Sequence, residues 1–494
     1  MKPTPQQQKI FDWFETGSGH LVVRARAGTG KTTTILKGIE RAPENRILVT
    51  AFNKRIVKEA GVKIGCIDWP ARKNVQASTL NSVGNNICLA SKSRMDKDKL
   101  HKLLQEVMTG DDLKYKGTAV KDLVGKAKGM APFAETWEDI LPIVQEFQIK
   151  VSTWPDPKEE RRLAEWAIRL MKLCLVNDRT YDFDDQIFLP LRLGWAQPTF
   201  ELVVVDEAQD MNYAQNEFAV KIAHARVCVV GDDRQAIYRF RGADVHALDR
   251  MGTLLKAKEE KLTFTFRCAK SIVAKAKVLV PDFEAGPNNP EGEILFADIH
   301  QIFTMAKPGD VILSRKNAPL MRLCLSFWKQ GVNAGIAGLD LLAQIKRFIE
   351  KTLRPTRIEG LLRSLDEWVK KEVAKVKARK QSEDKETEIL DKADVVRSVA
   401  LEADSVPEVY ALLDRLFANE DDVSQADPCD PAEAAPAGIL LSSVHKAKGL
   451  EWKRVFLLED TFNTRNLEEK NIRYVAITRA KSTLILVTGK LGDQ

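Results

Sequence analysis

The stretch that decides the fold is HLVVRARAGTGKTTTILKGIERAPENRILVTA, residues 20–51. It predicts a short apolar strand at 20–24, a glycine-containing loop at 27–32, a helix that follows the loop, and a second strand at 46–51. This order of strand, loop, helix and strand is a βαβ unit, which implies a parallel sheet.

Further apolar runs extend the α/β pattern. Within 201–205 and 226–230, residues 202–205 and 227–230 are continuously apolar and are followed by acidic residues, as in parallel strands buried on both faces. A second α/β pattern begins near residue 266, and lysine-rich helical stretches interrupt both halves. Its predicted strands are 310–314, 439–442, 454–458 and 482–487, and the acidic, proline- and alanine-rich segment 419–438 is expected to be a flexible connector.

The composition is that of a globular protein with several folding units. Of 494 residues, 44% are hydrophobic and 29% are charged, which excludes collagen-like and wholly disordered chains. The net charge of +7 permits a polyanionic partner without demonstrating one. Seven scattered cysteines without a CxxC pair argue against a zinc or iron–sulfur site. No secretory signal and no long apolar run is found, so we expect a cytoplasmic protein that does not engage a membrane.

The loop Ala27-Gly-Thr-Gly-Lys-Thr32 has the composition of a phosphate-binding loop. Glycines let backbone N–H groups surround phosphate oxygens at the N-terminus of a helix. Lys31 is expected to reach the β and γ phosphates of a nucleotide, and the Thr32 hydroxyl to ligate Mg²⁺. The full motif has glycine six residues before the lysine, where this chain has Ala25. The nucleotide-binding residues expected here are Ala27, Gly28, Thr29, Gly30, Lys31, Thr32 and Thr33.

Two adjacent carboxylates follow the strand at 201–205. Strands of a parallel sheet present their carboxyl ends to the ligand, so Asp206 is expected to hold Mg²⁺ through water and Glu207 to polarise the attacking water. An acidic strand end that merely caps a helix is the alternative. These features predict nucleotide hydrolysis and leave kinases, transporters, GTPases and motors open.

The segments DEAQD at 206–210 and GDDRQAIYRFRGA at 231–243 resemble motifs II and III of superfamily 1 DNA helicases of the UvrD/Rep type. The remaining motifs of that family are matched in order along nearly the whole chain. They are TPQQ at 4–7, LVTAFNK at 48–54, STLNS at 78–82, YDFDD at 181–185, LTFTFR at 262–267, SVHKAKGLEW at 443–452 and the segment 468–480.

The resemblance implies an α/β P-loop NTPase with two RecA-like parallel-sheet domains, each with an inserted, mainly helical subdomain. The implied boundaries are 1–90 and 185–265 for the first domain, 91–184 for its insertion, 266–343 and 438–494 for the second domain, and 344–437 for its small insertion. The implied activity is that of an ATP-dependent DNA helicase and single-stranded DNA translocase of 3′ to 5′ polarity. ATP and Mg²⁺ are the implied cofactors.

The same resemblance assigns further nucleotide-site residues. Arg267 and Arg479 are the implied arginine fingers, whose charge stabilises the transferred phosphoryl group. Gln235 is the implied γ-phosphate sensor. Adenine is expected to contact Gln7, with Gln8 as the alternative, and to stack on Phe266, while Glu451 contacts the ribose or nucleotide; core packing for Phe266 and helix capping for Glu451 are the alternatives.

Single-stranded DNA and its junctions with duplex are the implied partners of a monomer. Aromatic side chains that stack on bases, beside basic groups that hold phosphates, grip a strand without reading its sequence. The chain departs from the family pattern at Phe52, which is displaced by one position, at Asn81 and at Phe240. The DNA-contacting residues implied are Phe52, Lys54, Thr79, Tyr238, Phe240, Arg241 and His445.

Three alternatives stay open. The first is a translocase that clears bound proteins and unwinds weakly, because only 15 residues follow Arg479, where the family carries a strand-separating hairpin. A nucleotide kinase is the second, although the finger arginines and the segment 443–452 argue against it. A non-catalytic scaffold is the third, and the intact site residues argue against that. RNA would satisfy the same stacking and phosphate contacts as DNA.

Overall fold

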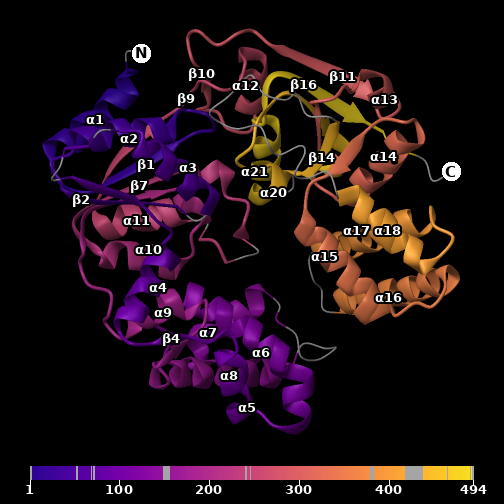
Figure 1. Ribbon diagram of the computed structural model, residues 1–494, viewed down its shortest axis with the longest axis horizontal. Coiled ribbons are helices and arrows are strands. Elements are labelled where there is room, and N and C mark those ends of the chain that lie inside the picture. The colour runs from indigo at the N-terminus through magenta and orange to yellow at the C-terminus, as the bar shows by residue number, and fades with distance from the viewer. Residues whose placement is uncertain are drawn as a thin grey trace. The chain divides into compact units, whose positions relative to one another are not determined.

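Residues 3–51, 54–67, 69–70, 73–147, 149, 156–239, 242–244, 246–378, 383–417, 438–463, 466–489 and 491 are described by the computed structural model (Figure 1). The chain divides into two units, Met1–Phe264 and Thr265–Gln494. The predicted connector at 419–438 falls almost entirely outside the described residues.

Six parallel strands form the central sheet of the first unit, in the order β3-β2-β6-β7-β1-β8. The inner four strands are those that the sequence predicts. The two edge strands were not predicted, because they are short or charged and lack an apolar run. The bounds are β1 (Leu21–Ala25), β2 (Arg46–Ala51), β3 (Asn74–Ala77), β6 (Phe200–Asp206), β7 (Ala223–Gly231) and β8 (Lys258–Leu262).

Helices cover both faces of this sheet (Figure 1). On β6, Val203 and Val205 pack with the helices of one layer, whereas Leu202 and Val204 pack with those of the other. This alternation explains the continuous apolar run, because both faces of the strand are buried. The first layer contains α10 (Tyr213–Lys221) and α11 (Ala247–Leu255), and the second contains α1 (Pro5–Thr16) and α2 (Lys31–Arg41).

A helical insertion lies between β3 and β6 along the chain. It comprises α5 (Lys99–Val107), α6 (Gly110–Met130), α7 (Trp137–Glu146) and α8 (Pro157–Val176), flanked by α4 (Leu80–Ala90) and α9 (Asp185–Arg192). The short strands β4 (Arg94–Met95) and β5 (Thr180–Tyr181) pair where the chain enters and leaves it. Its apolar residues form a cluster distinct from the two that line the sheet.

The second unit is built on another six-stranded parallel sheet, in the order β11-β16-β15-β12-β14-β13. Again the four inner strands were predicted and the two edge strands were not. With the first sheet, this confirms the predicted fold of two parallel-sheet α/β domains. The bounds are β11 (Glu293–Asp298), β12 (Val311–Ser314), β13 (Ala334–Ile336), β14 (Ile439–Ser443), β15 (Trp452–Leu458) and β16 (Ala480–Thr488).

The helices of the second unit include a second insertion, drawn in orange in Figure 1. It comprises α15 (Leu339–Phe348), α16 (Ile358–Ala378), α17 (Glu383–Ala400) and α18 (Val406–Phe417). The sheet is accompanied by α12 (Lys270–Lys277), α14 (Ala318–Lys329), α20 (Val444–Ala447) and α21 (Leu467–Ile477). Within the described residues, no helix has the length and apolar character needed to cross a membrane.

Candidate nucleotide site

The predicted phosphate-binding loop connects the carboxyl end of β1 to the first residue of α2, Lys31. Gly28 and Gly30 have φ values of 68° and 76°, a left-handed conformation that costs glycine little and most other residues more. Within the loop, the Thr29 hydroxyl donates to the carbonyl of Arg26 at 3.0 Å. The loop therefore places the N-terminal N–H groups of α2 at the sheet edge, where a phosphate would bind.

Four predicted residues meet at this edge. Lys31 Nζ lies 2.5 Å from Glu207 Oε1, and the Thr32 hydroxyl donates to Asp206 Oδ2 at 3.4 Å. Asp206 is the last residue of β6, so the sheet brings together segments about 175 residues apart in the chain. Glu207 has a φ of 53°, an uncommon conformation for a residue other than glycine that is typical of functional sites.

Charge and burial perturb the acid–base properties of this group. Burial and the charge of Glu207 raise the pKa of Asp206 to about 6. Burial alone would lower the pKa of Lys31, but the charges of Glu207, Asp206 and Asp232 outweigh it and raise that pKa. The adjacent hydroxyl and carboxylate oxygens of Thr32 and Asp206 are the hard ligands that Mg²⁺ prefers, so these residues fit the expected cation.

The predicted sensor Gln235 lies just beyond β7. Its amide Nε2 donates to Asp232 Oδ2 at 2.7 Å, and its side chain is buried. Three residues of this neighbourhood, Arg26, Gln209 and Asp232, were not among the predicted site residues, yet they connect Gln235 to Glu207 and Lys31. The sequence did carry one signal for them: the strand that becomes β7 ends at an acidic pair, Asp232 and Asp233.

The two candidate adenine-contacting glutamines lie in different surroundings. Gln7 Nε2 donates to the Thr34 hydroxyl on α2 at 3.1 Å, and its Oε1 accepts from the N–H of Thr4 at 3.0 Å. Gln8 instead donates to Asp12 on the exposed side of α1 at 2.7 Å. This geometry favours Gln7, which adjoins the helix that begins in the phosphate loop.

In the second unit, two predicted residues form an ion pair. The Arg267 guanidinium pairs with the Glu451 carboxylate, which also lies 2.7 Å from Lys481 Nζ. Phe266, next to Arg267, is 42% exposed, so it is not a core residue.

The second predicted finger, Arg479, is almost fully buried beside this pair. Its guanidinium donates to the carbonyls of Val475 and Leu450 at 3.0 and 2.9 Å. Burial and the nearby charge of Arg267 lower the pKa of Arg479 to about 10, which leaves it cationic at neutral pH. The second unit therefore gathers Phe266, Arg267, Glu451 and Arg479.

The predicted DNA-contacting residues are only partly described. Thr79 is buried, and its hydroxyl caps α4 by accepting from the N–H of Ser82 at 3.1 Å. Tyr238 follows β7 and His445 lies on α20, and both are half-buried. Phe52, Phe240 and Arg241 lie outside the described residues, as does the side chain of Lys54, which begins α3 (Lys54–Gly65).

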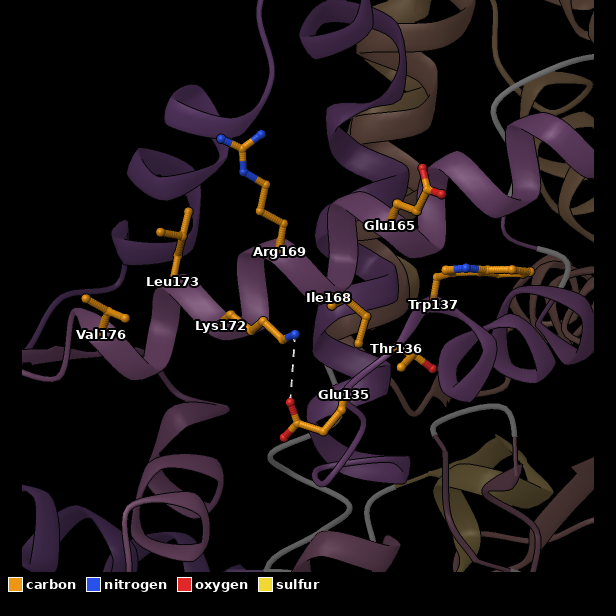
Figure 2. A pocket seen from close by; sticks show the side chains of 9 residues that line it. All are labelled: Glu135, Thr136, Trp137, Glu165, Ile168, Arg169, Lys172, Leu173 and Val176. Carbon is orange, nitrogen blue, oxygen red and sulfur yellow. Dashed lines mark ion pairs between the residues drawn. The ribbon is translucent and has the colours of Figure 1, made fainter.

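A separate hollow of about 450 Å³ lies in the first insertion, between α7 and α8 (Figure 2). Trp137, Ile168 and Leu173 contribute apolar surface, and Lys172 pairs with Glu135 at 3.8 Å. None of the predicted site residues lines this hollow.

The fold and the site define a P-loop nucleotide-binding protein with two RecA-like domains. Residues 4–256 match the UvrD/REP helicase N-terminal domain, and residues 438–487 match the UvrD-like helicase C-terminal domain. The chain belongs to the UvrD/REP helicase family, which confirms the resemblance seen in its motifs.

Several curated proteins are similar to this chain. F-box DNA helicase protein 1 of Schizosaccharomyces pombe is 25% identical over 98% of this chain and 57% of its own length. ATP-dependent DNA helicase PcrA of Bacillus subtilis is 24% identical over 99% of this chain and 82% of its own. ATP-dependent DNA helicase Rep of Escherichia coli is 26% identical over 59% of this chain and 44% of its own. The chain thus spans little more than half of the fission yeast protein and most of the Bacillus protein.

Proposed function

We propose that this chain is an ATP-dependent DNA helicase that translocates on single-stranded DNA in the 3′ to 5′ direction, using ATP and Mg²⁺. The observation that carries the proposal is the meeting of Lys31, Thr32, Asp206 and Glu207 at the carboxyl edge of the first sheet. The names of its relatives, which are DNA helicases, support DNA as the track. The polarity rests on the resemblance of the motifs alone.

The ion pair between Lys31 and Glu207 suggests how hydrolysis is kept dependent on substrate. In this arrangement, the Glu207 carboxylate that would act as base is neutralised by the lysine at 2.5 Å. Phosphate oxygens of ATP compete for the same ammonium group, so their binding frees Glu207 to polarise a water molecule. Bound Mg²⁺ would be held directly by Thr32 and through water by Asp206, and would supply positive charge beside the phosphates.

Two arginines are proposed to supply further positive charge. Arg267 and Arg479 act as the arginines that stabilise the transferred phosphoryl group, and Gln235 senses the γ-phosphate. Gln7 and Phe266 contact adenine, and Glu451 contacts the nucleotide. Phe52, Lys54, Thr79, Tyr238, Phe240, Arg241 and His445 are proposed to contact the DNA strand.

The first test is ATP hydrolysis with and without single-stranded DNA, beside strand displacement on 3′-tailed, 5′-tailed and blunt duplexes. DNA-stimulated hydrolysis with unwinding from 3′ tails is expected. Unwinding from 5′ tails alone would refute the polarity. Stimulation without unwinding would identify a translocase that clears proteins from single strands. Hydrolysis indifferent to DNA would refute the helicase and favour a phosphotransferase.

The matched variants are Glu207→Gln, directly after the carboxyl end of β6, and Glu201→Gln, near the amino end of the same strand. Glu207→Gln is expected to lower kcat by about 10²–10⁴-fold, because the base that polarises water is lost. Glu201 accepts from the N–H of Asn45 at 2.7 Å at the opposite end of β6, so its variant should hydrolyse ATP normally. Equal losses in both variants would show a folding defect rather than a catalytic one.

A further inference from the structure

Arg26 is a buried cation between β1 and the phosphate-binding loop. It follows β1 directly, is 7% exposed, and its Nη1 lies 2.8 Å from Asp232 Oδ1 and 2.7 Å from Asp233 Oδ1. Its N–H also donates to the carbonyl of Leu262, at the end of the neighbouring edge strand, at 2.9 Å. A buried guanidinium costs folding free energy unless it is paired, so its position demands these two carboxylates.

The two carboxylate oxygens of Asp232 contact different groups. Its Oδ1 faces Arg26 and also accepts from the N–H of Arg234 at 3.1 Å, while its Oδ2 accepts from the amide of Gln235 at 2.7 Å. The carboxylate is inaccessible to solvent, so its orientation is set by these partners. Arg26 therefore acts on Gln235 through one shared carboxylate.

A second path leads from Asp232 to the proposed base. The N–H of Asp232 donates to Gln209 Oε1 at 3.0 Å, and Gln209 Nε2 donates to Glu207 Oε2 at 2.5 Å. The approach of Gln209 requires glycine at position 231, because a Cβ there would lie 2.6 Å from Gln209 Oε1. Together with the ion pair between Glu207 and Lys31, these hydrogen bonds form a continuous chain of contacts from Arg26 to Lys31, at the two ends of the phosphate-binding loop.

We propose that Arg26 is a positioning residue for ATP hydrolysis, which orients Gln235 through Asp232 and Glu207 through Asp232 and Gln209. The inference rests on the proposed function and deepens it. Arg26 does not touch the phosphates in this scheme. It fixes the geometry of two groups that do the chemistry, so its loss should slow turnover more than it weakens ATP binding.

The charges around Asp232 also support a positioning role for Arg26. Burial raises the pKa of Asp232, and the charge of Arg26 is the largest influence opposing that rise. Without Arg26, the buried carboxylate is left with less compensation and must rotate or take up a proton. Either change disturbs the acceptor that holds the Gln235 amide.

The test compares two buried arginines, Arg26, which pairs with Asp232 just beyond the carboxyl end of β7, and Arg226, which lies in the amino-terminal half of β7. Arg26→Gln and Arg26→Lys alter the hydrogen-bond network around Asp232, just beyond the carboxyl end of β7. Arg226→Gln and Arg226→Lys are the matched controls, because Arg226 lies near the amino end of β7, is 2% exposed and pairs with Glu44 at 2.5 Å. For each variant we would measure kcat and KM for ATP with single-stranded DNA, binding of a fluorescent ATP analogue, and the melting temperature.

Arg26→Gln is expected to lower kcat by about 10²-fold, a size typical of misplaced catalytic groups, with analogue binding nearly unchanged. Arg26→Lys should recover part of that loss, because it restores the charge without the planar two-carboxylate geometry. Arg226 variants should lower the melting temperature and leave kcat of the folded fraction unchanged.

Unchanged kcat in folded Arg26→Gln would overturn the inference, and so would an equal loss of kcat in Arg226→Gln. If Arg26→Gln does not fold, Arg26→Lys decides: reduced kcat with normal binding supports the inference, and wild-type kcat refutes it. A wild-type protein without ATP hydrolysis would refute the proposed function itself, so the two failures are distinguishable.

Discussion

The two helical insertions are attached to their α/β domains by different interactions. The first has an apolar cluster of its own, distinct from those that line its sheet, and buried charges lie where it meets the domain. The second shares one continuous cluster with its sheet, from Phe456 and Ile485 on the strands to Val396 and Leu413 on the insertion helices. The apolar cluster of the first insertion reaches Phe188 and Leu189 on the flanking helix α9 and is supplemented by buried ion pairs, whereas the second insertion packs directly into the apolar core of its sheet.

The polar attachment is a buried ion cluster of Lys99, Lys128, Asp182 and Asp185. Lys99 Nζ and Lys128 Nζ each lie 2.7 Å from an oxygen of Asp185, and Lys128 lies 3.2 Å from Asp182. Asp185 begins α9, so the cluster joins α5 and α6 to the segment that returns to the sheet. A buried charge without a partner is strongly destabilising, so removing any one of these four side chains should weaken the attachment.

Polar contacts supplement the apolar attachment, and one of them caps a helix. Asp391 on α17 accepts from the N–H groups of Asn317 and Ala318 at 3.0 and 2.9 Å, which caps the N-terminus of α14. Here many small contributions add up, and each can be weakened without exposing a buried charge. We therefore expect the loss of one buried ion pair to unfold the first insertion before its sheet, and the second insertion to unfold only together with its sheet.

The largest effect is expected for Lys128→Met. The change leaves Asp185 buried with one cation fewer, and breaking such a pair costs about 3–5 kcal/mol. Urea denaturation followed by hydrogen exchange should show α5, α6 and α8 unfolding before the sheet. Lys126→Met is the control, because Lys126 forms a more exposed pair with Asp122 and should cost under about 0.5 kcal/mol. Similar stability of the two variants would contradict the role of the cluster.

The next effect is expected for Leu413→Ala on α18. This side chain is fully buried in the shared cluster, and its truncation should cost about 2–4 kcal/mol. Because the core is continuous, β13, β14 and α14 should lose exchange protection in the same transition as α18. Leu401→Ala, at a side chain 68% exposed, should be nearly neutral. Loss of protection confined to the insertion would show that it folds independently.

Lowering the pH should destabilise the first insertion before the second, by a smaller amount than these substitutions. Burial alone would raise the pKa of Asp185, but the charges of Lys128 and Lys99 outweigh it and hold that pKa below its ordinary value. The stabilisation is complete above about pH 4, the unfolded pKa, and is lost as the pH falls from there towards the folded pKa. Hydrogen exchange, corrected for its intrinsic rate, should rise in α5 and α6 before α14 and α18, and the reverse order would contradict this prediction.

The smallest effect is expected for Asp391→Ala. Removing the cap of α14 should lower the free energy of unfolding by about 1 kcal/mol, because its two N–H groups lose a charged acceptor. Asp340→Ala, which removes an exposed ion pair with Lys446, should change it by less than about 0.5 kcal/mol. Equal values from chemical denaturation would show that solvent replaces the cap without loss.

The predicted strands differ from the missed ones in a regular way. All inner strands of the two described sheets were predicted, because burial on both faces requires a continuous apolar run that the sequence displays. The four edge strands of the two six-stranded sheets were missed. The edge strand β8, KEEKL at 258–262, has the charges that protect a sheet edge, and nothing local marks it as a strand. Its conformation follows from pairing with β1.

The residues of the nucleotide site also fall into those that the sequence predicts and those that only the structure reveals. The sequence by itself determined the phosphate loop, the acidic pair Asp206 and Glu207, and membership in a helicase family, because each motif is contiguous and its chemistry is local. Only the tertiary structure decided that Arg26 pairs with Asp232, 206 residues away, and that Gln209 connects this pair to Glu207. Partners so distant share no periodic pattern, and a buried charge shows its need for a partner only once the fold has removed it from water.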